Sequence, residues 1–433
     1  MSDSKFSSLP VRKREIFGWA MFDFANSSYT TVIVTVAFSI YFTKMVAPGG
    51  KADWLWGVAI TISNLIVILL APVMGAISDD SGRKKIFLFG TYVMCVLGTA
   101  SLYWVLPGSI WLGVFLFVIS NVAYSLGENF AAAFLPELST PENIGRISGF
   151  GWGLGYLGGL GCLLLVLPRV SAGFTPENLP NLRLTWLLTA AFFLVAGLPT
   201  FLLMRERAEQ GPKRTLVAYA RVGFSRLATS AHAFKHFSEL GRFLAIFFVY
   251  SCGLMSVIAF AAIFAERNLG FSAKDLMILF IVLQLSSAVG AMGFGVMQDR
   301  LGAKVTIQLT LVLWLVLSVS TYLCTSKSVF WVISLAAGLG IGSLQAASRA
   351  LVGLFSPLSK AGEFFGFWGL ASRAAYALGP LVFGLVSSVS GSQHLALLVN
   401  GGFFLFGLWL MQYVDEKAGY QAARSWREEF QQS

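Results

Sequence analysis

The few ionisable residues that lie inside long apolar runs of this chain are of types that can bind an ion or a solute. Asp23 and Asn26 lie in the first run, Glu128 lies in the fourth and Arg373 in the eleventh. A charged side chain in such a run is costly unless it faces a polar cavity or a partner, so these positions are candidates for function. We therefore expect Asp23, Asn26, Glu128 and Arg373 to contact a solute or a coupling ion.

The specific chemistry that these residues suggest is exchange of an ion-pair partner. A carboxylate can take up a proton, whereas an arginine keeps its charge. We expect Asp23 and Arg373 to interact across a central cavity in one state and to separate in another, when a solute or a proton replaces a partner. The alternative interpretation is a structural ion pair that ties helices together. Glu128 fits either interpretation, because it also fits a position at the membrane interface.

A short segment at positions 75–84, GAISDDSGRK, recurs at 295–304 as GVMQDRLGAK. Each copy follows an apolar run, and a repeat at half the chain length indicates two equivalent halves. The glycines allow a tight turn, and the aspartate can bind the positive N-terminal end of a helix in the other half. A solvated basic turn is the alternative. We expect a cytoplasmic gate built from Gly75, Asp79, Gly82, Arg83, Gly295, Asp299, Arg300 and Gly302.

Twelve apolar runs are long enough to span a bilayer, which takes about 20 residues. The chain is 56% hydrophobic and 12% charged, whereas soluble proteins carry about 25% charged residues. The pattern predicts an all-α integral membrane protein with two pseudo-symmetric six-helix halves. The runs cover 17–42, 54–77, 86–106, 109–135, 147–167, 184–204, 243–264, 276–297, 305–324, 329–355, 364–386 and 395–413.

The distribution of basic residues predicts how the chain is oriented. Most of the 31 lysines and arginines fall in segments on one side of the twelve spans, which marks that side as cytoplasmic. Arg349, at the inner end of the tenth span, is assigned to this side. The predicted parts are a cytoplasmic tail (1–16), the first half (17–204), a cytoplasmic linker that is partly helical (205–242), the second half (243–413) and a cytoplasmic tail (414–433).

Several function classes are disfavoured by what the chain contains. The basic charge is explained by orientation in the membrane, so no nucleic-acid partner is expected. The four cysteines lie in separate apolar runs, and the three histidines lie in loops. The sequence carries no Ser/His/Asp group, no metal-ligand cluster and no phosphate-binding loop. We expect neither an enzyme nor a cofactor or metal site, and a proton would have to be carried by a carboxylate.

The repeated segment resembles the signature of the major facilitator superfamily, Gly-x-x-x-Asp-x-x-Gly followed by basic residues. Further segments resemble one branch of it, the vacuole-effluxer-type (autophagy-related effluxer) family. These segments are WAMFDFANS, FLPE, GRISGFGWGLGYLGG, QAASR and EFFGF, which begin at 19, 134, 145, 345 and 363. The resemblance implies the twelve-helix transporter fold, and it implies amino acids as candidate solutes and export as the direction.

These observations together predict a secondary active transporter that moves a small solute by alternating access. We expect a monomer embedded in lipid in the plasma (inner) membrane, with protons as candidate coupling ions. Two alternatives remain at this point. One is a sensor or scaffold that has the fold without transporting. The other is a membrane-embedded enzyme, which the missing catalytic groups disfavour.

Overall fold

The computed structural model describes residues 10–47, 49, 51–209, 211, 218 and 236–432. Within these ranges the regular elements are helices, and twelve helical segments are long and apolar enough to cross a membrane. The twelve predicted spans are therefore confirmed, and most extend a few residues further than predicted. Large apolar side chains such as Leu69, Trp111 and Leu202 are more than two-thirds exposed, which suits contact with lipid.

The first half contains six spans. Its elements are α1 (Lys13–Tyr29), η1 (Thr30–Val36), α2 (Phe38–Tyr41), η2 (Phe42–Val46), α3 (Ala52–Ser81), α4 (Lys84–Ser101), η3 (Leu102–Trp104), α5 (Ile110–Ala132), α6 (Leu135–Leu138), α7 (Ile144–Val170), η4 (Pro176–Asn178) and α8 (Leu179–Leu203). The first span is not one regular helix, because η1 and η2 are π-helical. Such wide turns occur often at functional sites.

The second half also contains six spans, followed by a terminal helix. Its elements are α10 (Ser238–Leu269), α11 (Ala273–Leu301), α12 (Ala303–Tyr322), α13 (Lys327–Phe355), η5 (Leu358–Lys360), α14 (Ala361–Ser390), α15 (Gln393–Met411) and α16 (Glu416–Gln432). Each half has its own buried apolar cluster. Most of the partly helical linker predicted at 205–242 lies outside the described residues.

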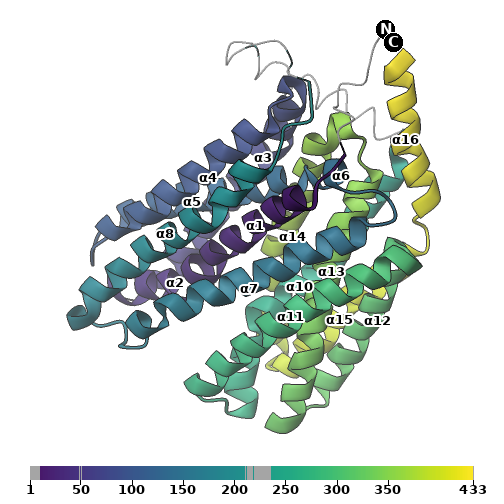
Figure 1. Ribbon diagram of the computed structural model, residues 1–433. Helices are drawn as coiled ribbons and strands as arrows, with labels where there is room; N and C mark the ends of the chain where they lie inside the picture. The colour runs from purple at the N-terminus through teal and green to yellow at the C-terminus, as the bar shows by residue number, and fades with distance from the viewer. Residues whose placement is uncertain are drawn as a thin grey trace.

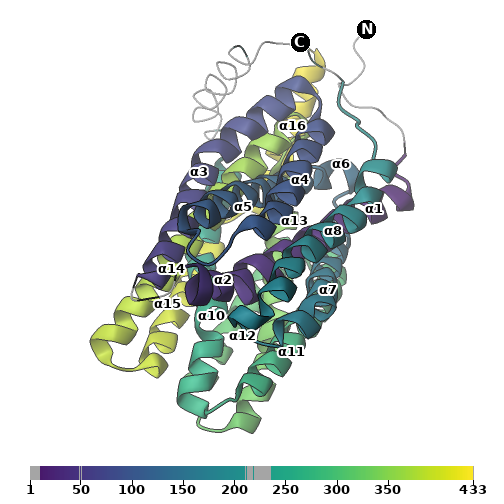
Figure 2. The same ribbon diagram turned by 90° about the vertical axis from the view of Figure 1, so that its left-hand side faces the viewer.

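The two halves meet along two seams. In one seam α7 packs against α11 and α13, and in the other α3 and α5 pack against α14. Figure 1 shows the halves leaning together at the end of the bundle where the two termini lie and diverging toward the other end. Figure 2 shows the termini and α16 at that same end. We call it the closed end. It contains the starts of α1, α7 and α14 and the turns after α3 and α11. The opposite end is the open end.

Candidate functional site

Asp79 lies in the last turn of α3 and binds the first turn of α14 in the other half. Its Oδ1 accepts a hydrogen bond from the backbone N–H of Gly362 at 3.0 Å, and its Oδ2 accepts one from that of Glu363 at 2.9 Å. The N-terminus of a helix has unpaired N–H groups and partial positive charge, so a carboxylate is stabilised there. The predicted contact of Asp79 with a helix end in the other half is confirmed.

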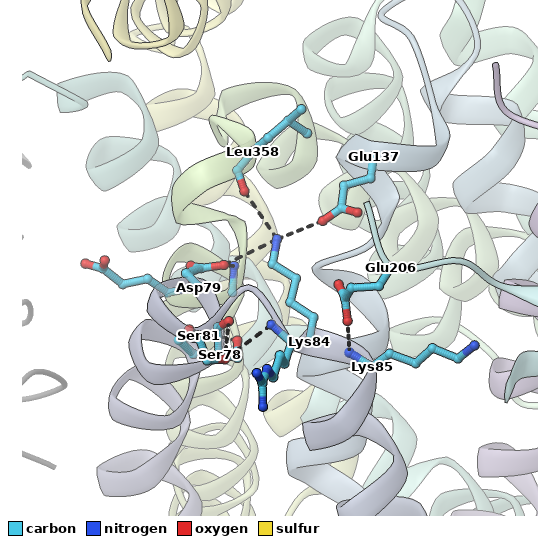
Figure 3. Close-up of polar contacts among 12 residues, drawn as sticks. Ser78, Asp79, Ser81, Lys84, Lys85, Glu137, Glu206 and Leu358 are labelled. Atoms are coloured by element: carbon cyan, nitrogen blue, oxygen red, sulfur yellow. Dashed lines mark hydrogen bonds and ion pairs between the residues drawn. The ribbon is translucent and has the colours of Figure 1, made fainter. Parts of the chain in front are cut away.

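Lys84, the first residue of α4, sits between Asp79 and a second carboxylate (Figure 3). Its Nζ lies 3.3 Å from Oδ1 of Asp79 and 2.9 Å from Oε1 of Glu137, and it donates to the carbonyl of Leu358 at 3.2 Å. The three charged side chains are almost completely buried. Because Leu358 belongs to the second half, Lys84 adds a further bond between the halves at the closed end.

Asp299 is the counterpart of Asp79 with the halves exchanged. It lies in the last turn of α11, and its Oδ1 accepts hydrogen bonds from the backbone N–H groups of Gly145 and Arg146 at 2.9 and 3.2 Å. These residues begin α7 in the first half. The guanidinium of Arg146 also lies 3.2 Å from Oδ2 of Asp299. The sequence repeat thus produces two matched contacts, one on each seam.

The glycines of the repeat have two different roles, and the prediction of turns holds for only two of them. Gly82 and Gly302 have φ angles of +60° and +88° and end α3 and α11. Gly75 and Gly295 lie inside those helices. A Cβ on Gly75 would lie 2.1 Å from the carbonyl oxygen of Gly362, and one on Gly295 would lie 2.6 Å from that of Gly145. These two glycines therefore allow the backbones of the halves to touch.

The basic residues that the structure places against the gate carboxylates are Lys84 and Arg146. Arg83 lies between α3 and α4, where its backbone N–H donates to Oγ of Ser81 at 3.3 Å. Arg300 is exposed on the last turn of α11. Sequence comparison of the two copies aligns Lys84 with Lys304 and could have added Lys84 to the predicted gate. Arg146 has no such signal, because it lies outside the repeat.

Asp23 forms its ion pair with Arg349 in this state, and Arg373 pairs elsewhere, so the predicted contact of Asp23 with Arg373 stays a prediction for another state. Nη1 of Arg349 lies 2.7 Å from Oδ2 of Asp23. The other two nitrogens of Arg349 are also engaged, because Nε donates to Oγ of Ser148 at 3.1 Å and Nη2 donates to the carbonyl of Ser148 at 2.8 Å. Arg349 is 2% exposed. Arg349, which the sequence places at the inner end of its span, is thus buried between α1 and α7.

Arg373 pairs instead with Glu128. Nη2 of Arg373, in α14, donates to Oε2 of Glu128, in α5, at 3.0 Å. The ring of Tyr124 lies beside the guanidinium, with its centre 5.6 Å from Cζ of Arg373. In both ion pairs the carboxylate belongs to the first half and the guanidinium to the second. The two pairs therefore connect the halves, as the gate contacts do.

A cavity of about 400 Å³ lies between the halves. Its residues from α10 and α13 lie in the segments toward the open end, and Glu128 and Arg373 are also part of its lining. The residues that η1, α3 and α5 contribute are mainly polar: Thr30, Thr31, Thr35, Asn64, Asn121 and Tyr124. Most of those from α10 and α11 are apolar. The cavity is therefore bounded by the Glu128–Arg373 pair toward the closed end.

Two of the four predicted contact residues do not line this cavity. Asp23 lies beyond it in the ion pair with Arg349, and Asn26 is 5% exposed. Oδ1 of Asn26 is buried with no hydrogen-bond partner in the described part of the chain. The structure thus separates the predicted set into a pair in the cavity wall, Glu128 and Arg373, and two residues outside the cavity lining, Asp23 and Asn26.

A glutamate after the last span of each half binds the start of that half's third span. Oε2 of Glu206 accepts the backbone N–H of Lys85 at 2.8 Å (Figure 3). The carboxylate of Glu416 accepts those of Ala303 and Lys304 at 3.1 and 2.9 Å. Burial raises the pKa of Glu206 to about 7, against the opposing effect of the Lys85 hydrogen bond. Glu206 lies just outside the spans, beside the closed-end contacts.

Comparison with known proteins points to one family. Residues 58–424 match the family model described as vacuole effluxer Atg22 like. An uncharacterized MFS-type transporter, YxiO of Bacillus subtilis, is 25% identical over 408 residues, which cover 92% of this chain and 94% of that protein. Autophagy-related protein 22 of Kluyveromyces lactis is 23% identical over 410 residues, which cover 86% and 81%.

The fold is similar to solved transporters of the major facilitator superfamily. The human organic anion transporter MFSD10 gives a TM-score of 0.73 at 16% identity, with 93% of this chain and 100% of that chain covered. FucP in its outward conformation gives 0.70 at 13% identity, with 93% and 98% covered. At these identities the likeness establishes the fold: twelve spans in two six-helix halves.

Proposed function

Because this chain belongs to the vacuole-effluxer family of MFS-type transporters, we propose that it carries a small solute across the membrane by alternating access. The relatives are transporters, which leaves no support for a membrane-embedded enzyme. The gate formed by Asp79, Lys84 and Asp299 would separate and re-form as the halves rock, and Arg83 and Arg300 would support it at the membrane surface.

The observation that carries this proposal is the contrast between the two ends of the bundle. The cavity between the halves reaches toward the open end. At the closed end the halves are joined by helix-end contacts on both seams and by two ion pairs. A pore would require both ends open, and a scaffold would need neither the cavity nor the matched contacts. One accessible side is what a carrier has in one of its states.

The proton pathway proposed here begins at Asp23. Separation of the halves at the closed end would break the Asp23–Arg349 pair and leave two unpaired charges in a buried region. Such a loss costs about 3–5 kcal/mol unless the charge is neutralised. Protonation of Asp23 would neutralise the carboxylate, so proton uptake favours opening of the closed end. Asn26, one turn further along α1, would take part through its unpartnered oxygen.

The remaining parts of the proposal concern solute and setting. Export is the candidate direction, from the name of the family, and amino acids are the candidate solutes that the resemblance in the sequence implies. The basic-residue distribution supports cytoplasmic termini and a cytoplasmic linker at 205–242. We place the protein in the plasma (inner) membrane as a monomer surrounded by lipid. With this orientation the open end faces outward.

Counterflow in proteoliposomes tests transport directly. Vesicles loaded with a mixture of amino acids should accumulate a trace of external radiolabelled leucine, and protein-free vesicles should not. A parallel measurement follows labelling of a single cysteine at Thr35, which lines the cavity, with an impermeant maleimide. Absence of counterflow together with labelling that no condition changes would favour a sensor or scaffold over a carrier.

A further inference from the structure

The two interhelical arginines differ in their access to the cavity. Arg349 is 2% exposed and donates from Nε, Nη1 and Nη2 to Asp23 and Ser148. Arg373 lines the cavity, and its side chain is hydrogen-bonded to Glu128 and to the neighbouring Tyr124. A guanidinium has five N–H groups in a planar fork that suits a carboxylate. Arg373 faces the cavity, where a ligand carboxylate can reach it, whereas Arg349 does not line the cavity and is bonded to Asp23 and Ser148.

Glu128 and Arg373 also differ in how their charges can be compensated when the ion pair between them breaks. The guanidinium keeps its charge at any ordinary pH, so it must find another anion. The carboxylate can take up a proton and become neutral. An entering anion and a proton can therefore replace the pair without leaving a buried unpaired charge. An entering cation would leave Arg373 without a partner.

The walls of the cavity specify the rest of the ligand. Beyond the ion pair, α10 and α11 contribute apolar side chains that include Val257, Ile258, Phe280 and Leu283. Burying apolar surface against these residues stabilises a bound hydrocarbon group. The first half offers hydroxyl and amide groups, such as Thr31 and Asn64, that hydrogen-bond one edge of a ligand. The cavity therefore suits a molecule with one anionic end and an apolar body.

We propose that the solute is a monocarboxylate with an apolar body, bound by Arg373 in place of Glu128, which takes up one proton. This proposal rests on the transport function proposed above. The ligand carboxylate forms its ion pair with Arg373 as the Glu128–Arg373 hydrogen bond breaks, and the proton from solution goes to Glu128. The net charge of the site is zero before and after, so one proton accompanies each anion.

The groups that influence Glu128 come from five helices, one of which is its own. Arg373 on α14 is its partner, Asp23 on α1 and Arg349 on α13 act on it electrostatically, and Tyr124 and Tyr156 complete its titratable neighbours. The charges of Asp23 and Arg349 oppose one another at Glu128 because the two form their own ion pair. When a ligand takes Arg373 away from Glu128, the carboxylate therefore loses the charge that most affects its protonation.

Four probes of one shape test the ligand class on the purified full-length protein. They are 4-methylpentanoate, its neutral amide, leucine and leucinamide, each titrated while binding is followed by calorimetry. We expect 4-methylpentanoate and leucine to bind and both amides to bind at least about tenfold more weakly, since they lack the anion. Acetate should also bind at least about tenfold more weakly than 4-methylpentanoate, because it lacks the hydrocarbon group that the apolar wall of the cavity would bury.

Proton uptake and two variants identify the residues. Binding of 4-methylpentanoate should take up one proton, seen as a dependence of the heat on the buffer's ionisation enthalpy. In the range where Glu128 is ionised, binding should weaken about tenfold for each unit of pH. E128Q should bind the anion without proton uptake or this pH dependence, and R373Q should lose binding. The control variants E177Q and R267Q change exposed residues and should behave as the parent does.

Three outcomes would overturn the inference. Tight binding of leucinamide, or binding of leucine without binding of 4-methylpentanoate, would make the ammonium the recognised group. Retained binding in R373Q would remove the arginine from the site. Counterflow of a neutral solute without any carboxylate binding would leave the transport proposal standing and contradict this one. Carboxylate binding without counterflow would support the binding site proposed here and contradict the transport proposal.

Discussion

Asp79 and Asp299 hold the ends of helices from opposite halves, each with two backbone hydrogen bonds to one carboxylate. The contacts lie on different seams, so the halves are joined at the closed end by two contacts of the same kind. Because the two contacts use the same chemistry, the effect of weakening one can be compared directly with the effect of weakening the other.

Replacing Asp79 by asparagine should shift the population away from the state with the closed end shut. The amide keeps an oxygen acceptor but loses the charge at a helix N-terminus, an effect worth up to about 2 kcal/mol when partly buried. Labelling of a cysteine at Thr35 from the open end should slow accordingly. D299N should act in the same direction, and D53N, at an exposed position, should not. Equal labelling in all variants would contradict the gate.

Replacing Lys84 by methionine should destabilise the fold more than either gate variant. The buried carboxylates of Asp79 and Glu137 would lose their shared cation, and an uncompensated buried charge costs about 3–5 kcal/mol. Thermal unfolding in detergent measures the loss, with K51M as the exposed control. K84M combined with E137Q should recover part of the stability. A double variant less stable than K84M would show that Glu137 acts independently of Lys84.

Asp23→Asn should abolish proton-driven uphill transport while some exchange of solute persists. The amide cannot take up a proton, yet it can still accept a hydrogen bond from Arg349. The charge swap D23R with R349D should restore stability better than transport, because it restores a pair but moves the titrating group. Uphill transport of D23N at the parental rate would make Asp23 structural only.

The stability of the folded protein should fall as pH rises from about 4.5 to 7, because the unfolded chain loses the proton of Glu206 in this range. Burial raises the pKa of Glu206 in the folded protein to about 7, from 4.5 for an unperturbed glutamate. The folded protein therefore holds a proton that the unfolded chain releases in this window, which favours folding at the acid end. E206Q should flatten this part of the profile of melting temperature against pH, and E209Q should not. An identical slope in E206Q would exclude Glu206 as the cause.

The orientation of the chain can be checked at its C-terminal tail. A cysteine at Lys417, an exposed residue after the last span, should be labelled by an impermeant reagent only after the membrane is permeabilised. A cysteine at Asp53, at the opposite end, should be labelled in intact cells. The reverse pattern would place the closed end outside and would invert the assignment of the open end.

The sequence predicts the spans and the gate carboxylates well because both leave local signals. A span needs a long apolar run, and Asp79 and Asp299 recur within a matched segment. The ion-pair partners leave no such signal. Arg349 lies six residues before the end of α13, and its inward direction depends on the close approach of α1 and α7. Which of two arginines meets Asp23 is decided by the packing of distant helices, which a single sequence does not encode locally.

The origin of the paired charges has a consequence for any solute that carries a dipole. The first half supplies Asp23 and Glu128, and the second half supplies Arg349 and Arg373. An electric field therefore points across the cavity from the second half toward the first. A polar molecule entering from the open end is turned with its negative end toward the second half before any hydrogen bond forms. The halves would then sort molecules by orientation as well as by size.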